Sequence, residues 1–270
     1  MHRAVVCAAV IFTLSGCGGG NTASSVQAPG AEETAKTKAL ETGAALLQDR
    51  PPVDAINAYL DGFHFYNGQM KVHMEAHHYC AILNEDVIQC TIYDGNVKGA
   101  KLMGVEYIIS ETLFAGLPEQ EKALWHSHVQ EVKSGQLIAP GIPEVAEHAL
   151  MEKLIHTYGK TWHTWHTDLD KDLPRGMPQL MMGFTADGQA DPAMVAARDA
   201  RLGVSSEDKR KRRADIAAPS IDAGADAWQK GKVIQIEDPM GGHAHAGKAG
   251  PDAPSDGDKN ATSKGSSSGR

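Results

Sequence analysis

The sequence has little cysteine, no excess of basic residues and none of the common catalytic motifs. Four cysteines in 270 residues are too few for the dense disulfide scaffold of a small secreted domain. Acidic residues outnumber basic ones and the formal net charge is −8, which argues against nucleic acid as a partner. The chain also lacks a Ser-His-Asp order, a glycine-rich phosphate loop and a His-Glu-x-x-His helix. These absences argue against the usual hydrolases and nucleotide-binding enzymes.

A long apolar run is missing as well, and the one short run marks an export signal. Residues 4–14 are almost entirely apolar and follow Arg3, but a membrane-spanning helix needs about 20 residues. The run ends in Leu14-Ser15-Gly16-Cys17, which resembles the lipobox of bacterial lipoprotein signals, where the cysteine receives a lipid. We therefore expect export, cleavage before Cys17, and attachment to a membrane through the lipid on Cys17. Gly18, in place of an aspartate, favours the outer membrane, facing the periplasm or the cell exterior.

Composition divides the chain into five segments. Small polar residues follow Cys17, and Gly, Ser, Pro and Lys dominate the end, so neither stretch has enough apolar surface to fold. The expected segments are a signal peptide (1–16), a flexible tether (17–31), an α+β domain (32–217), an extension that the sequence does not define (218–240) and a disordered tail (241–270). The central segment is long enough to bury a single core.

The central segment contains both helical and strand patterns. Helices are predicted over residues 32–48 and 53–65, which would form a hairpin over the core, and over 117–135, 142–159 and 192–202. β-Branched and aromatic residues between turn-forming groups predict a three-stranded antiparallel meander over 76–110, with two more strands over 160–168 and 179–185. This order predicts an α+β fold, in which one antiparallel sheet packs with helices in a single domain.

Cys80 and Cys90 fall in the first hairpin of the predicted meander. A loop at residues 84–86 places Cys80 opposite Cys90, with His78 on the same face of the sheet. Opposed residues on antiparallel strands are close enough for a disulfide, and the expected compartment is oxidising. Three interpretations remain open: a disulfide, two packed thiols, or two ligands that bind zinc or copper together with His78 and one remote histidine.

Histidine is unusually frequent, and one pair has a spacing typical of metal sites. Of 13 histidines, ten lie between His64 and His166. On a strand, His126 and His128 would face one side, and Glu131 would complete a metal site of the cupin type. The proline and glycine that bound residues 117–135 instead favour a helix, on which residues two apart point about 200° apart. We therefore expect a helix, with His128 turned inward and no shared ion.

Three other residues are candidates with a structural alternative. His163 alternates with His166 on a predicted strand, so one of the two should be buried. Glu106 and Glu111 lie near the end of the third strand of the meander. They are candidate carboxylate ligands or general bases, or else salt-bridged residues at a strand edge.

Seven blocks of the chain resemble, in order and in wording, the oil body-associated protein family, which was also catalogued as a domain of unknown function. The blocks cover about residues 63–213 and read FHFYNGQM, EAHHYC, VIQCTIYD, GVEYIIS, LPEQEKALWHSHVQEVKSG, YGKTWHTW and LPRGMPQLMMGFT. The resemblance implies relatives in plants, fungi and bacteria, an association of the plant members with seed oil bodies, and no established reaction. With its lipobox-like signal, the chain is identified as a bacterial lipoprotein member.

The resemblance also ranks the histidines and cysteines. His73 and His166 stand where family members carry other polar residues, so both are set aside. Plant members work where thiols are reduced, which weakens a purely disulfide role for the two cysteines. The residues that follow the family's pattern are His64, His77, His78, Cys80, Cys90, His126, His128 and His163.

Two functional hypotheses follow. The first is a non-catalytic, membrane-anchored module that binds lipids or organises a lipid surface, since the expected anchor and the family both point to lipid. The second is a metal-binding protein or metalloenzyme. Its zinc or copper ion would be held by some of His77, His78, Cys80, Cys90, His126, His128 and His163, with His64, Glu106 and Glu111 as further candidates.

Overall fold

A computed structural model describes residues 20–237. The export signal, Cys17 and the expected disordered tail lie outside the described residues. The strands are β1 (Ala58–Tyr66), β2 (Gln69–Ile82), β3 (Val87–Tyr93), β4 (Leu102–Ser110), β5 (His126–Ser127), β6 (Thr157–His163) and β7 (Gln179–Met182). The helices are α1 (Ala35–Leu47), α2 (Pro51–Asp54), α3 (Glu111–Ala115), α4 (Glu119–Lys122), α5 (Val129–Lys133), α6 (Glu144–Leu154), α7 (Pro192–Leu202), α8 (Ser206–Arg212) and the short 3-10 helix η1 (Ala227–Lys230).

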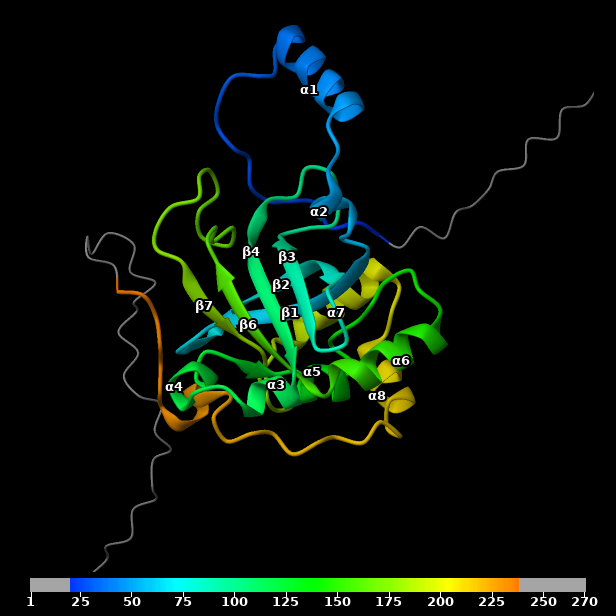
Figure 1. Cartoon of the computed structure of the whole chain (residues 1–270), viewed down its shortest axis with the longest axis vertical. Helices are drawn as coiled ribbons and strands as arrows, with labels where there is room; N and C mark the ends of the chain where they lie inside the picture. The colour runs from blue at the N-terminus through cyan, green and yellow to red at the C-terminus, as the bar shows by residue number, and fades with distance from the viewer. Residues whose placement is uncertain (1–19, 238–270) are drawn as a thin grey trace, which may run out of the picture.

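Six antiparallel strands close into a barrel (Figure 1). Hydrogen bonding runs in the order β4, β3, β2, β1, β7 and β6, and β6 then pairs with β4, so the ring is complete. The predicted fold class is therefore wrong: the strands form a closed barrel, not an open sheet packed with helices. The meander over 76–110 is confirmed as β2, β3 and β4. The pairing that closes the ring joins Gly104 to His163, far apart in the chain.

β1 is buried on both faces, which explains the helix-like spacing in its sequence. Residues 60–66 are all buried. Leu60 packs with Cys80 in one cluster, while Phe63 belongs to another that includes side chains of α7, and the Arg198 guanidinium lies 4.7 Å from the Phe63 ring centroid. A strand buried on both faces loses the alternation of polar and apolar residues. The predicted helix over 53–65 is thus wrong for nearly its whole length.

β5 and β7 share one edge of β6. β7 pairs with residues 161–163 of β6 and β5 with residues 158–159, so the short β5 fills the wall where β7 ends. A bridge from Asp61 to Ile138 ties the chain after α5 to β1. The predicted helix over 117–135 is wrong: this stretch forms α4, β5 and α5, because pairing with β6 outweighs the local helical signals.

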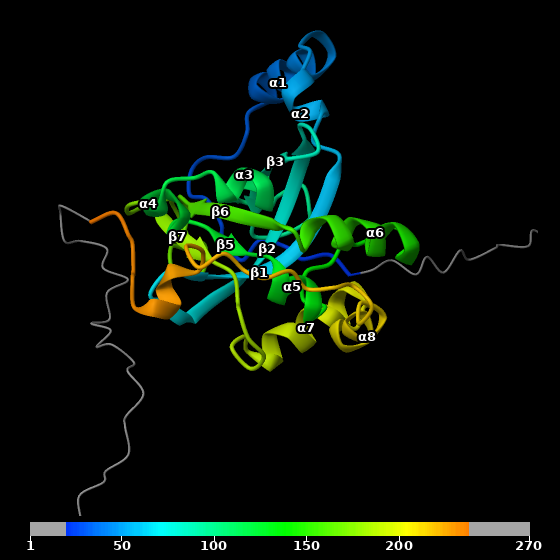
Figure 2. The same cartoon turned by 60° about the horizontal axis from the view of Figure 1, so that its bottom comes forward.

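Most of the helices after β5 lie on one side of the barrel (Figure 2). α5, α6, α7 and α8 gather on one side, whereas α1 stands away from the barrel and has no buried residue. α1 and α7 are confirmed as helices, but the predicted helical hairpin over the core is wrong. None of the helices within residues 20–237 combines the length and the apolar character needed to span a bilayer.

The chain after α8 returns to the barrel. The backbone N–H of Asp226 donates to the Trp125 carbonyl, and the Trp228 ring lies 5.0 Å from the ring of Phe65. The Gln235 side chain bonds both the N–H and the carbonyl of Leu180 in β7. This segment therefore packs beside β5 and β7, where the sequence alone defines no structure.

Candidate functional site

The carboxylate of Glu106 lies at the centre of a group of histidines inside the barrel. Glu106 belongs to β4 and is only 2% exposed. Its oxygens lie 2.9 Å from His78 Nε2, 3.3 Å from His128 Nε2, 3.4 Å from His126 Nε2 and 3.9 Å from His64 Nε2. Because β4 and β1 are not neighbours in the ring, these contacts cross the barrel interior. We call His64, His78, Glu106, His126, His128 and Glu131 the Glu106 cluster.

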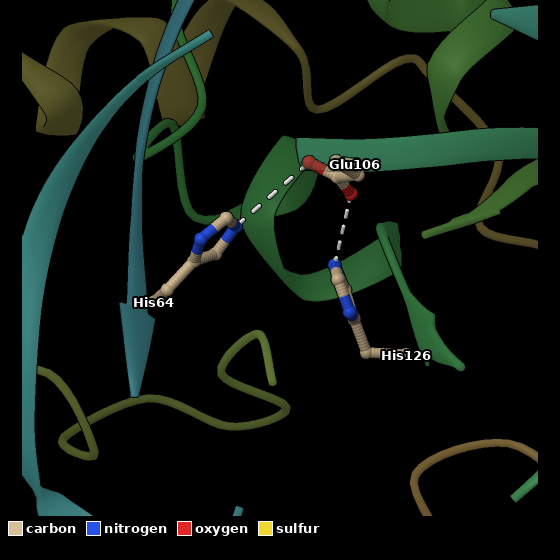
Figure 3. Close-up of side chains that lie close together, drawn as sticks. All are labelled: His64, Glu106 and His126. Atoms are coloured by element: carbon tan, nitrogen blue, oxygen red, sulfur yellow. Dashed lines mark ion pairs between the residues drawn. The ribbon is translucent and has the colours of Figure 1, made fainter. Parts of the chain in front are cut away.

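Different elements aim these side chains at one point, as Figure 3 shows for two of the histidines. His64 comes from β1 and His78 from β2, while β5 supplies His126. His128, with φ −84° and ψ 1°, then turns the chain from β5 into α5, which carries Glu131. The ring centroids of His126 and His128 are 5.1 Å apart, and both rings approach Glu106. The expectation that only His128 of this pair points inward is therefore wrong.

Hydrogen bonds fix the protonated nitrogen in two of the histidines. His78 Nδ1 lies 3.1 Å from the Ala76 carbonyl, which can only accept, so Nδ1 donates. Thr157 Oγ1 donates to the Leu154 carbonyl and therefore accepts from His128 Nδ1, 2.7 Å away. In the neutral rings, Nε2 of both histidines then directs a lone pair at a carboxylate oxygen. Such a contact is repulsive unless a proton or a cation lies between the two atoms, and metal-binding histidines are commonly oriented in this way.

Several polar atoms in and beside the cluster have no hydrogen-bond partner. They are both ring nitrogens of His126, Oε2 of Glu131 and Nδ1 of His163. His126 is fully buried and Glu131 is 5% exposed, and a buried polar atom without a partner costs about 1–3 kcal/mol. His126 Nε2 and Glu131 Oε2 are 3.9 Å apart, too far for a hydrogen bond but suited to two ligands of one ion.

Two glycines keep space for the cluster. A Cβ atom on Gly159 of β6 would overlap Glu106 Oε1 and lie 2.8 Å from His126 Nε2. A Cβ atom on Gly183, just after β7, would lie 2.9 Å from Glu131 Oε2. A cavity of about 10 Å³ borders the cluster, which is close to the space that one water molecule needs. Because these two positions are glycines, the interior has room for the imidazole and carboxylate groups of the cluster and for little more than one water molecule.

The ionisation states of the cluster depend on one another. Burial favours the neutral form of Glu106, but the close contacts with the imidazoles of His126, His128 and His78 outweigh it and hold its pKa well below the ordinary value. Burial acts to lower the pKa of His78, yet the Glu106 carboxylate raises it above the ordinary value. Burial keeps the pKa of His64 well below the ordinary value and raises that of Glu131. The cluster thus contains an ionised carboxylate among imidazoles whose pKa values shift in opposite directions.

The two cysteines lie beside the cluster but are bonded to each other. Cys80 is opposite Cys90, as the predicted register requires, and Cys90 is opposite Glu106. The two Sγ atoms form a disulfide, and both residues are buried. A disulfide offers no thiolate to an ion, so the available donors are nitrogen and oxygen atoms.

His77 lies in a separate network on the outer face of the barrel. Its Nδ1 is 3.0 Å from Asp61 Oδ2, and its Nε2 is 3.3 Å from Glu75 Oε1. Asp61 also pairs at 2.5 Å with Arg198 of α7, and both side chains are fully buried. The bound guanidinium already neutralises this carboxylate, so we read the group as an ion-pair network that fastens α7 to β1.

The remaining histidines and the second glutamate considered as site residues lie in different surroundings. His163 reaches the cluster through His64, with 3.5 Å between His163 Nε2 and His64 Nδ1. His166, set aside on sequence grounds, is also buried. Glu111 is half exposed and pairs with His156.

Sequence reasoning missed part of the site for identifiable reasons. Glu131 carries a readable signal, the His-x-His-x-x-Glu spacing, which the helical assignment of residues 117–135 overrides. Gly159 stands at the end of a predicted helix, yet it lies in β6 and faces Glu106. No local pattern reveals this, because the partner strand is distant in the sequence.

Comparisons with known proteins agree on one family. The chain matches a family model described as "Protein of unknown function (DUF1264)" over residues 50–217, which contain all six strands of the barrel. It is 43% identical to oil body-associated protein 1A of Zea mays over 83% of this chain and 96% of that protein. It is 42% identical to oil body-associated protein 1B of Arabidopsis thaliana over 80% of this chain and 90% of that protein. No solved structure matches the chain.

Proposed function

The chain belongs to the oil body-associated protein family, and from that premise we propose that this member binds a transition-metal ion inside its barrel. One observation carries the proposal: four histidine nitrogens point at a single buried carboxylate. Backbone and hydroxyl partners behind two of these rings leave the inner nitrogens free to bind. An ion at the centre would replace the repulsion between these lone pairs with metal–ligand bonds.

The donor types limit the choice of ion. Imidazole nitrogen suits zinc, copper, iron and nickel, and carboxylate oxygen is compatible with each of them. With Cys80 and Cys90 in a disulfide, no soft sulfur ligand favours copper(I) or a sulfur-rich zinc site. A bound ion would supply a Lewis acid or an activated water molecule in an enclosed, mostly apolar space.

Metal analysis of the untagged chain tests the proposal. Protein isolated from cells grown with trace metals should contain about one or more equivalents of a transition metal. Glu106→Gln should lower the content at least tenfold, because it removes the central donor. His156→Ala is the matched control, because this half-exposed histidine pairs with Glu111 and not with a residue of the Glu106 cluster. Folded wild-type protein that stays below about a tenth of an equivalent, even after reconstitution, would refute the proposal.

A second function is compatible with the first. We propose that the lipid on Cys17 holds the chain at a membrane, at the outer membrane facing the periplasm or the cell exterior, and that lipids are its partners. The lipobox-like Leu14-Ser15-Gly16-Cys17 and the oil bodies named in its relatives support this. So does α1, on which Leu46 and Leu47 are 79% and 86% exposed, because a lipid surface could cover them.

A further inference from the structure

The carboxylate of Glu106 presents its two oxygen atoms to two different pairs of histidines. Oε2 faces His78 and His64, which come from neighbouring strands β2 and β1. Oε1 faces His128 and His126, which come from β5 and the turn after it. Figure 3 shows one histidine of each pair approaching its own oxygen. A carboxylate that binds one ion through one oxygen would gather its companion ligands on a single side.

The ligand atoms of the Glu106 cluster are spread more widely than the coordination sphere of one ion. Ligands of one ion at bond lengths near 2.1 Å lie within roughly 4 Å of one another. Ligand atoms of His64, Glu106 and His126 fit within 4.8 Å, and so do those of His126, His128 and Glu131. The two triads share only His126, and the first of them takes one histidine from each side of Glu106. The cluster therefore offers more donors than one tetrahedral ion uses, over a wider volume.

We infer that the Glu106 cluster holds two metal ions bridged by the Glu106 carboxylate. This inference rests on the proposed function and specifies the site further. One ion would bind His64, His78 and Glu106 Oε2. The other would bind His126, His128 and Glu106 Oε1, with Glu131 as a further ligand. Each ion keeps an open position for water, as catalytic metal sites do.

Buried carboxyl groups gather in and beside the cluster. Three carboxylates lie in or beside the cluster: Glu106, Glu131 and Asp226, which are 2%, 5% and 4% exposed. Asp226 accepts a hydrogen bond from the N–H of Ser127, the residue between His126 and His128. A cation bound by the cluster would lower the cost of burying these carboxylates in their charged form.

The small cavity indicates the class of ligand that such a pair would take. It is bordered on one side by the cluster and on the other by Leu60, Ile108, Leu137 and Leu154. Its volume of about 10 Å³ admits roughly one water molecule. The exogenous ligand shared by the two ions would thus be water, hydroxide or a comparably small oxygen species, and not a lipid chain.

Metal stoichiometry tests the inference. The full chain would carry His243→Ala and His245→Ala, so that histidines of the C-terminal tail do not bind the added ion. Titration with Co²⁺ against a chelator, followed by mass analysis of bound metal, should give two equivalents in this background. His78→Ala and His128→Ala should each retain one equivalent, because each removes a ligand of a different ion, while Glu106→Gln should weaken both by at least tenfold. One equivalent in the parent chain overturns the inference and leaves the proposed function standing, whereas none overturns both.

A spectroscopic measurement removes the dependence on variants that fail to fold. Two Cu²⁺ ions bridged by a carboxylate should show spin coupling, with fewer isolated spins than copper atoms and a half-field signal in electron paramagnetic resonance. The parent chain alone suffices for this experiment. Isolated-spin spectra with one spin per bound copper would contradict the bridge.

Discussion

At the scale of single residues, the site depends on side chains whose neighbours leave them few alternatives. Glu106 would be costly to bury alone, and the imidazoles around it make its ionised form favourable. His128 is held from behind by Thr157, so its inner nitrogen cannot turn to another partner without losing that bond. Gly159 contributes by having no side chain. None of these roles can be predicted from the type of residue, because each depends on the neighbouring side chains.

Gly159→Ala tests the space that this glycine reserves. The added methyl group would overlap Glu106 Oε1 and crowd His126 Nε2, so one of the two side chains must move. We expect metal affinity to fall at least tenfold, measured by competition with a chromogenic chelator. Gly116→Ala is the matched control, because its Cβ would meet nothing nearer than 3.5 Å. A Gly159→Ala protein that binds metal like wild type would mean that Glu106 is not a required ligand.

At the scale of elements, the decisive feature is the break between α4 and α5. Capping residues, acidic first turns and apolar spacing all favour a helix through residues 117–135, and α4 and α5 preserve both of its ends. Between them, two residues of β5 pair with β6 and fill the wall beside β7. Two backbone pairings thereby change the directions of His126 and His128. A helix would have kept them about 200° apart.

The β2–β3 hairpin provides a prediction at the same scale. Cys80→Ala with Cys90→Ala should lower the free energy of unfolding by about 2–4 kcal/mol, as expected when a disulfide closing a short loop is lost. Metal content should stay within twofold of wild type, since the donors are imidazole and carboxylate. Chemical denaturation and metal analysis of the same preparations give both values. Loss of metal without loss of folding would show that the sulfur atoms act as ligands.

At the scale of the whole molecule, the chain combines a closed barrel that has a buried polar centre with an N-terminal segment that is expected to attach to a membrane. The residues of the Glu106 cluster are at most 5% exposed and border a cavity of about 10 Å³, so we expect only small ligands there. In the described residues that precede the barrel, Gly20 and Thr22 hydrogen-bond to Arg201 of α7 and to Asn96, whereas α1 has no buried residue. Attachment and metal binding are therefore expected to be separable.

Cys17→Ser tests that separation. In a bacterial host, the wild-type chain should fractionate with membranes and its mature N-terminus should carry a lipid detectable by mass spectrometry. The variant should appear in the soluble or uncleaved fraction with its metal content unchanged, because Cys17 contributes no ligand. The disulfide-free Cys80→Ala/Cys90→Ala chain is the matched cysteine control and should remain lipidated. Wild-type protein without a lipid would remove the proposed membrane attachment.

The sequence by itself determined those features that depend on neighbouring residues. The meander over 76–110, the register that places Cys80 opposite Cys90, and the helix α7 follow from period-2 spacing, turn residues and helix signals close to each element. The sequence also carried the family, because its blocks are long and ordered. His64 and His78 were recognisable as candidates for the same reason, whereas Glu106 was a candidate because a carboxylate near the end of the third predicted strand can act as a ligand or a general base.

Only the tertiary structure decided how these pieces come together. Closure of the barrel depends on β6 pairing with β4, and no local pattern encodes a partner so distant in the chain. That closure makes β1 a strand buried on both faces, turns His126 and His128 to the same side, and brings Gly159 against Glu106. The site is the product of non-local pairing, since residue types supply the donors but the closed ring gives them a common centre.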